Sequence, residues 1–327
     1  MLIFLVPILA AVFLAAGYLM FAYRGAGDLL NPTRKPVVRT PKEYGLDYED
    51  IEFRSTDGIN LNGWLIPGKS NFQHERVIIL PHAMNFNRHG WWPTRRIESL
   101  YHQPDVDFLP IAKALNHSGY SILMFDLGNH GESDGRKMCG VGLNEYQDIA
   151  GAVEYVGHRY REDSPRIGII AFCLGANSTI IAMSKARERM RDVVFLVLIQ
   201  PVTPRVFLRG FTKSVYTRLA LLLIPVTERL YRWRGGYDLD EMSPQNYAGD
   251  INVPTLHVQA KEDNWTTLSD VRSIYDRIGG PKELWLIEGK MKRFDTYVYL
   301  GKQPDRIIDF ASRHFSHDVT QRHIAAR

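Results

Sequence analysis

The segment best suited to chemistry is residues 166–177, Arg-Ile-Gly-Ile-Ile-Ala-Phe-Cys-Leu-Gly-Ala-Asn. It predicts a buried strand over 167–172, a tight turn at Cys173 and a helix from Leu174. A sharp strand-to-helix turn between small residues exposes one reactive side chain and aims helix amides at the group it attacks. Cys173 is therefore a candidate nucleophile. The alternative is a cysteine that acts as a small buried hydrophobic residue in an ordinary turn.

A cysteine at this position relaxes the demands on its surroundings. A serine hydroxyl is far from ionised at neutral pH and needs an adjacent base. A thiol needs less help, because a helix N-terminus or a neighbouring cation favours the thiolate form.

Alternating strands and helices are expected to position this turn. Strand patterns cover 76–80, 121–125, 166–172, 193–200, 255–259 and 283–287, and helical spacing covers 107–117, 143–160, 174–187, 268–278 and 303–314. Residues 50–67 predict a hairpin around Asp57-Gly58. The order predicts an α/β fold with a mostly parallel central sheet and helices on both faces.

Residues 204–245 interrupt this alternation and include the apolar run 219–224 and the aromatic-basic run 231–234. The segment follows a strand, where insertions that cover a ligand occur in open sheets, so we expect a small helical lid that covers a ligand site. A core helix explains the apolar run equally well.

The N-terminal residues 1–23 hold a long apolar run without charge. Its length predicts a single transmembrane helix, with a cleaved signal peptide as the alternative. A proline-containing linker follows over 24–47. Its basic residues predict, by the positive-inside rule, a cytoplasmic globular part at the membrane. They are Arg24, Arg34, Lys35, Arg39 and Lys42.

The composition narrows the function classes. The formal net charge of +4 comes from dispersed residues, which gives no support to nucleic-acid binding. The two cysteines, Cys139 and Cys173, make neither a disulfide framework nor a four-thiolate metal site. We expect no cofactor and no metal, and the sequence leaves the oligomeric state open.

Four motifs in order give the chain a wider resemblance. They are Pro81-His-Ala-Met-Asn85 after a strand, residues 125–135 (Phe-Asp-Leu-Gly-Asn-His-Gly-Glu-Ser-Asp-Gly), the turn at Cys173, and residues 253–263 ending in Asp263. Together they resemble the α/β-hydrolase superfamily over about residues 45–315. The cysteine further resembles the dienelactone hydrolase and polyhydroxyalkanoate synthase branches. The resemblance implies that Asp263 is the triad acid and that the amides of Met84 and Leu174 form an oxyanion hole.

One position departs from that family. The family carries its catalytic histidine after the last strand, but residues 287–297 contain none, and Arg293, or Lys292 after a one-residue shift, takes its place. An arginine is permanently charged and cannot act as a base, yet it can stabilise a thiolate. Three histidines, His82, His89 and His130, lie in loops that the resemblance places near the site, where each is either structural or a substitute base. His314 falls inside the last helix, and we expect it to cap or decorate that helix.

Two functions follow from these residues. The first is a hydrolase or acyl transferase domain over residues 48–317, before a tail at 318–327, that acts on an apolar acyl ester or thioester. Cys173 would be its nucleophile, Asp263 its acid and Arg293 its thiolate-stabilising cation. The second is a catalytically impaired binding or scaffold module, in which Asp263 and Arg293 form a structural ion pair.

Overall fold

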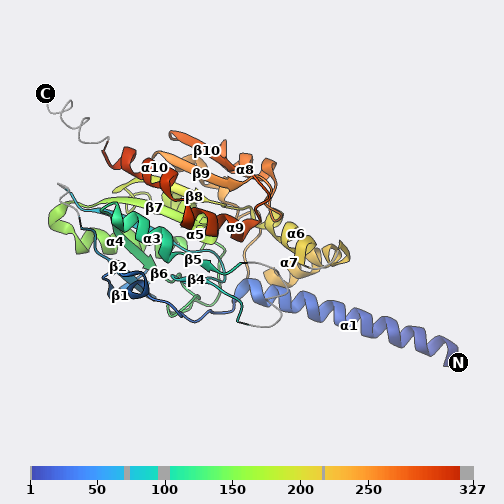
Figure 1. Cartoon of the computed structure of the whole chain (residues 1–327). Coiled ribbons are helices and arrows are strands. Elements are labelled where there is room, and N and C mark those ends of the chain that lie inside the picture. Colours follow the sequence, from blue (N-terminus) through green and yellow to red (C-terminus); the bar gives the residue numbers. More distant parts are fainter. Residues whose placement is uncertain (1, 70–73, 95–103, 216–217, 317–327) are drawn as a thin grey trace.

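A computed structural model describes residues 2–69, 74–94, 104–215 and 218–316, and these ranges form one central sheet between two layers of helices (Figure 1). Eight strands in these ranges are ordered β1-β2-β6-β3-β7-β8-β9-β10. Within this eight-stranded sheet, only the pairs β1–β2 and β2–β6 are antiparallel, so the predicted mostly parallel sheet is confirmed. The strands are β1 Glu49–Arg54, β2 Asn60–Ile66, β3 Arg76–Pro81, β6 Ser121–Phe125, β7 Arg166–Phe172, β8 Val193–Ile199, β9 Thr255–Ala260 and β10 Lys282–Ile287.

The inner strands are buried on both faces, as their continuous apolar sequences predict. In β7, every residue after Arg166 is buried, and the strand lies between β3 and β8 in the middle of the sheet. The carboxyl ends of β7, β8, β9 and β10 follow one another along one edge, because Phe172 pairs with Ile199 and Ile199 with Val258. Loops that follow these four strands therefore meet at one place.

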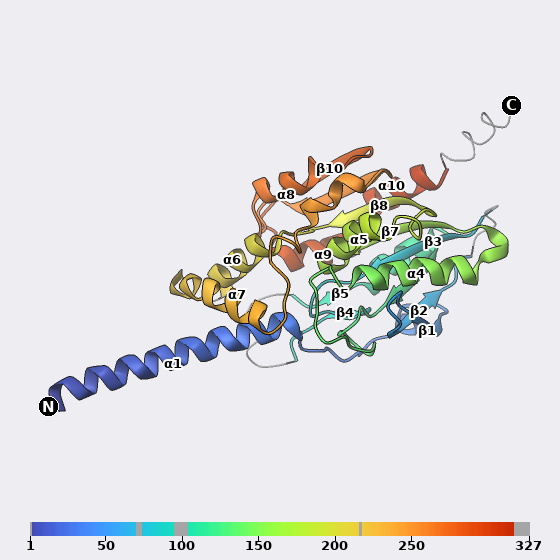
Figure 2. The same cartoon turned by 180° about the vertical axis from the view of Figure 1, so that it is seen from behind.

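Two apolar clusters attach helices to the two faces of the sheet. One cluster joins it to α3 Leu109–His117, α9 Arg293–Lys302 and α10 Asp305–Ser316. The other joins it to α4 Tyr146–Arg159, α5 Leu174–Lys185 and α8 Leu268–Tyr275. Figure 2, turned by 180°, shows the second layer from its own side. The short 3₁₀ turns are η1 Pro41–Tyr44, η2 Arg161–Asp163, η4 Pro244–Asn246 and η5 Ala248–Asp250.

Two features were not predicted from the sequence. The first is a small antiparallel pair, β4 Gly90–Trp91 with β5 Val106–Asp107. The second is helix α9, which begins at Arg293 inside the segment we read as a loop. Its start is fixed locally, because the Asp295 carboxylate accepts a hydrogen bond from the Lys292 amide at 2.9 Å.

The transmembrane anchor predicted for residues 1–23 is wrong. The predicted membrane localisation, which depended on that anchor, is wrong as well. Across the described ranges, no helix combines the length and apolarity that a bilayer crossing requires. The segment belongs to helix α1 Leu2–Leu30, which reaches well beyond the predicted boundary. Part of this helix packs on the domain: Ala22 and Ala26 are fully buried, and the Tyr18 hydroxyl donates to the Leu222 carbonyl at 2.6 Å.

Two of the basic residues that suggested a cytoplasmic orientation, Arg34 and Lys35, bind the domain. Arg34 donates to the Ser133 carbonyl at 2.5 Å. Lys35 is 2 % exposed and donates to Thr94 at 2.8 Å. Their charges are thus engaged in tertiary contacts, which explains their presence without reference to a membrane surface.

The lid segment, residues 204–245, lies beside α1 in both views (Figures 1 and 2). It contains α6 Pro204–Val215, η3 Arg218–Leu223 and α7 Ile224–Trp233. The apolar run that suggested a core helix forms η3, in which Leu222 is 66 % exposed. The Arg234 guanidinium lies 4.4 Å from the ring centroid of Tyr23 and ties the end of α7 to α1. The predicted C-terminal tail, 318–327, lies outside the described residues.

His257 of β9 should make stability depend on pH. Burial lowers the pKa of this fully buried histidine from 6.5 to about 3. Between these values the unfolded chain binds a proton that the folded protein does not, so stability is lost as pH falls from about 6.5 toward 3. The free energy of unfolding of His257→Leu minus that of the wild type should therefore increase by about 1.4 kcal/mol for each pH unit below 6.5.

Urea unfolding of both proteins at pH 7, 6 and 5 measures this difference. Asp148, whose pKa burial raises to about 6, has the opposite dependence, but it is present in both proteins and cancels. His117→Leu on the exposed side of α3 controls for loss of a histidine. A difference between wild type and His257→Leu that is constant with pH would contradict the assignment.

Candidate active site

Cys173 occupies a strained turn between β7 and α5. Its backbone has φ 46° and ψ −101°, a region that non-glycine residues rarely adopt and that costs of order 1–3 kcal/mol. The neighbouring strand holds the turn in place, because the Cys173 amide donates to the Ile199 carbonyl at 2.9 Å. The predicted strand, turn and helix are therefore all present, with the thiol at the N-terminus of α5.

Close packing explains the small residues around the turn. A Cβ on Gly175 would lie 2.5 Å from the Pro81 carbonyl oxygen, so a larger residue would push α5 away from β3. One helical turn later, Asn177 exchanges two hydrogen bonds with the backbone of Val202, at 2.9 and 3.1 Å. These contacts fix α5 against the loop that follows β8.

Asp263 and Arg293 meet as a buried ion pair, at the edge where the loops after the parallel strands converge. The Arg293 Nη2 lies 2.7 Å from the Asp263 Oδ2, and both side chains are 1 % exposed. The Arg293 Nη1 donates to the Gln200 carbonyl at 2.9 Å. Lys292, the alternative by a one-residue shift, is exposed. The structure thus places Arg293 against the residue that the resemblance implies as the acid.

Further donors surround the Asp263 carboxylate. The Gln259 Nε2 lies 3.0 Å and the Thr266 hydroxyl 3.1 Å from its Oδ2, and the Trp265 amide lies 2.9 Å from its Oδ1. These donors and the guanidinium satisfy both oxygens of the buried carboxylate. It holds the arginine in one position.

The charge on this pair extends toward the thiol. Burial alone lowers the pKa of Arg293, but the charge on Asp263, followed by that on Tyr297 and Cys173, outweighs burial and raises the pKa above its usual value. The guanidinium therefore lies within electrostatic range of the Cys173 sulfur. Arg293 Nε has no hydrogen-bond partner among the described residues.

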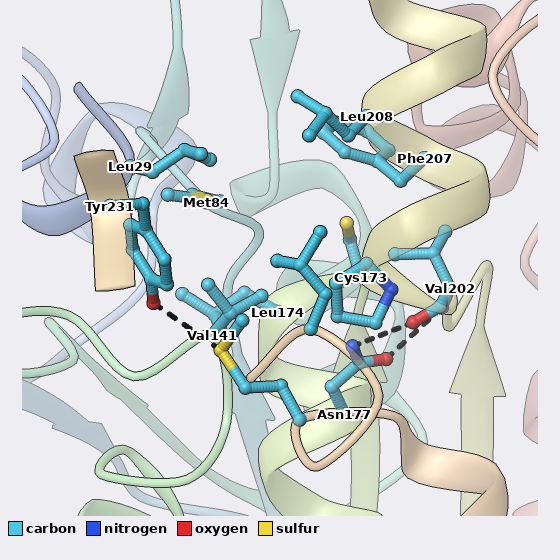
Figure 3. A pocket seen from close by; sticks show the side chains of 13 residues that line it. Leu29, Met84, Val141, Cys173, Leu174, Asn177, Val202, Phe207, Leu208 and Tyr231 are labelled. Carbon is cyan, nitrogen blue, oxygen red and sulfur yellow. Dashed lines mark hydrogen bonds between the residues drawn. The ribbon is translucent and has the colours of Figure 1, made fainter. Parts of the chain in front are cut away.

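Cys173 opens on an apolar cavity of about 40 Å³ that Met84 and Leu174 also line. In Figure 3 the thiol lies near Leu174 and Val202, with Phe207 and Leu208 of α6 above it. Leu174 is the first residue of α5, so its amide has no acceptor within the helix. The two residues predicted to form an oxyanion hole therefore lie on the same cavity as the nucleophile.

Helix α1 and the lid segment close this cavity. Leu29 lies on its wall, together with Tyr231 of α7 and the lid residues Leu239 and Met242 (Figure 3). The volume suffices for a few water molecules and is far below the roughly 300–1,000 Å³ of pockets that bind organic ligands. The structure is thus a closed state.

Among the residues that the structure describes, neither the three candidate histidines nor His314 lines the cavity. His82 has both ring nitrogens engaged, with the Ala83 carbonyl at 2.7 Å and the Leu127 amide at 3.0 Å, and burial holds its pKa well below 6.5. His130 bonds the Gly128 carbonyl at 2.9 Å.

The other two histidines pack against aromatic rings. His89 lies against Trp92, at a centroid distance of 5.0 Å. His314 of α10 lies against Phe310, at 4.4 Å. Neither residue takes the place of the missing base.

Two polar residues near the ion pair, Tyr297 and Asp270, were not predicted from the sequence. Tyr297 is fully buried on α9, one helical turn after Arg293, and its pKa responds to charge on Cys173. Asp270 at the start of α8 accepts the Thr203 hydroxyl at 2.6 Å and feels the charge of Arg293. A helix starting at Arg293 would have placed Tyr297 beside it, because residues four apart share a helix face. The Lys292–Asp295 spacing was the available signal.

Removal of one partner of the ion pair should destabilise the fold. Asp263→Leu leaves Arg293 charged and buried, and Arg293→Met leaves the carboxylate. We expect either single variant to lose about 3–5 kcal/mol in free energy of unfolding. The double variant removes both charges, so its loss should be well below the sum. Urea denaturation of the four proteins measures this coupling, and losses that simply add would show that the pair does not act as a unit.

Comparisons with known proteins agree with this architecture. The model of the alpha/beta hydrolase fold family matches residues 76–315. A protein of Salmonella typhi, YfhR, is 26% identical over 288 residues, which span 85% of each chain. YqkD of Bacillus subtilis is 23% identical over 252 residues, 73% of this chain and 79% of its own. The solved structure of an esterase from Pyrococcus furiosus superimposes with a TM-score of 0.66 at 24% identity, covering 88% of this chain and 98% of the esterase.

The family match shows the superfamily, and the structural match shows the fold. The finer resemblance to dienelactone hydrolases and polyhydroxyalkanoate synthases, and the roles of the individual site residues, stay predictions. The family match covers well over half of the chain. The strand order and the strained strand-to-helix turn at Cys173, here called the elbow, agree with it. The chain belongs to the alpha/beta hydrolase fold family.

Proposed function

We propose that this protein is a hydrolase that attacks the carbonyl of an apolar acyl ester or thioester through Cys173. The observation that carries the proposal is the thiol at a strained elbow, beside an arginine that a buried carboxylate holds in place. Membership of the hydrolase-fold family and the likeness to an esterase structure support hydrolysis as the reaction class. The apolar cavity supports an apolar acyl group.

Each site residue has one role in this proposal. The Cys173 thiolate attacks the carbonyl carbon, and Arg293 with the N-terminus of α5 stabilises its negative charge. Asp263 orients Arg293. The amides of Met84 and Leu174 receive the carbonyl oxygen as it becomes negative. The resulting thioester with the enzyme is then cleaved by water.

Substrate entry requires the lid segment or α1 to move. The closed cavity of about 40 Å³ has no room for an acyl chain. Phe207 and Leu208 of α6 line the cavity above the thiol (Figure 3), so a displacement of α6 enlarges the space above Cys173.

A non-catalytic binding module is the second candidate. The specific observation that favours it is the same Asp263–Arg293 pair, which satisfies the acid without a histidine and links the loop after β9 to α9. In this case Cys173 has no chemical role, and its replacement leaves the function of the protein intact.

Activity and thiol labelling distinguish the two candidates. We expect the wild type to hydrolyse p-nitrophenyl butyrate and butyryl thioesters, and Cys173→Ala to lose on the order of 10³-fold or more in kcat. Cys173→Ser should be equally inactive, because a hydroxyl needs a base and Arg293 cannot be one. Iodoacetamide should label Cys173 faster than Cys139 in the folded protein.

Cys139 is the matched control, because it is fully buried and burial raises the pKa of its thiol well above the usual value. Cys139→Ala should retain the activity of the wild type. If Cys173 reacts no faster than Cys139 and no ester or thioester is cleaved, the non-catalytic candidate is correct.

A further inference from the structure

A cysteine–arginine site leaves proton transfer unexplained. Attack by the thiolate needs no base, but an alkoxide leaving group needs a proton, and water needs a base when it cleaves the acyl-enzyme. Arg293 supplies neither function. Since His82 and His130 are bound to backbone groups and His89 packs against Trp92, another group must carry this proton.

Tyr297 of α9 lies one helical turn after Arg293 and packs against the end of the strand that leads to Cys173. It is 1 % exposed, and its ring meets the ring of Phe172, the residue before the nucleophile, edge to face at a centroid distance of 5.5 Å. The rings of Phe86 and Phe294 complete its surroundings at 6.0 Å each. With Phe108 at 6.3 Å, four aromatic side chains hold the phenol in one orientation beside the turn at Cys173.

Within the described residues, the Tyr297 hydroxyl makes no hydrogen bond of regular geometry, and its polar neighbour is the Arg293 guanidinium, whose Nε also lacks such a bond. A hydrogen bond between these two groups lowers the pKa of Tyr297 and raises that of Arg293. A hydroxyl with this one partner can make a further hydrogen bond, so it can still bond a departing oxygen.

Electrostatics keep this hydroxyl protonated in the resting enzyme. Burial raises the pKa of Tyr297 well above its usual value, charge on Cys173 raises it further, and the positive charge of Arg293 opposes both. The phenol is therefore neutral at physiological pH, and the same guanidinium stabilises the phenolate when it forms.

We propose that Tyr297 is the proton-transfer residue of this site and replaces the family histidine in that role. The assignment rests on the proposed function. In acylation, the Cys173 sulfur forms a bond to the carbonyl carbon, the bond from that carbon to the alkoxy oxygen breaks, and the Tyr297 proton passes to the departing oxygen. The products are the acyl-enzyme, an alcohol and the Tyr297 phenolate beside Arg293.

Deacylation reverses the proton flow. The phenolate takes a proton from water, the remaining hydroxide attacks the thioester carbon, and the carbon–sulfur bond breaks to release the carboxylic acid and the Cys173 thiolate. The net reaction is one ester and one water to one acid and one alcohol. Both protein groups return to their starting state.

Substrates with different leaving groups test this role. Tyr297→Phe keeps the aromatic contacts and removes only the hydroxyl. We expect kcat/KM for ethyl butyrate to fall about 100-fold or more, because ethoxide must be protonated as it leaves. For p-nitrophenyl butyrate, whose phenolate leaves without a proton, kcat/KM should stay within about 3-fold.

Tyr299→Phe is the control, since Tyr299 lies on the same helix and packs against Trp285 on the outer side, at a centroid distance of 6.5 Å. It should match the wild type with both esters. Equal losses of kcat/KM with both esters in Tyr297→Phe, or no loss with either, would overturn the assignment while leaving Cys173 as nucleophile. A wild type that cleaves neither ester would overturn the proposed function and this assignment together.

Discussion

The buried Asp263–Arg293 ion pair is the interaction on which the rest of the site depends. Its two charges lie 2.7 Å apart, almost fully out of water, so each is tolerable only in the presence of the other. Through the Gln200 carbonyl, the guanidinium also ties down the end of β8. The pair therefore joins the segments that follow three parallel strands and fixes a positive charge beside the elbow.

That positive charge determines which nucleophile the elbow can use. A serine beside an arginine would have no base, whereas a thiol ionises with help from a cation and a helix N-terminus. Cys173 and Arg293 are thus consistent with each other, although each alone departs from the usual serine–histidine arrangement of the fold. The strained turn at Cys173, held by the Ile199 carbonyl, indicates that the geometry of the elbow is retained.

Much of the fold could be predicted from the sequence, because its signals are local. Continuous apolar runs marked the inner strands, and small residues around Cys173 marked the elbow. The acid and Arg293 were found through the resemblance to a family. Tyr297 was missed because its role depends on where α9 begins, which the Asp295 carboxylate decides. The N-terminal run was misread as a membrane anchor, because apolarity alone does not reveal that Ala22 and Ala26 pack on the domain.

Trapping of the covalent intermediate tests the central claim most directly. The protein is mixed with p-nitrophenyl butyrate, quenched in acid within the first turnover, digested and mapped by mass spectrometry. We expect one butyryl group on Cys173, and none on the Cys173→Ala variant treated in the same way. Release of p-nitrophenol without an acyl group on Cys173, or an acyl group on another residue, would contradict it.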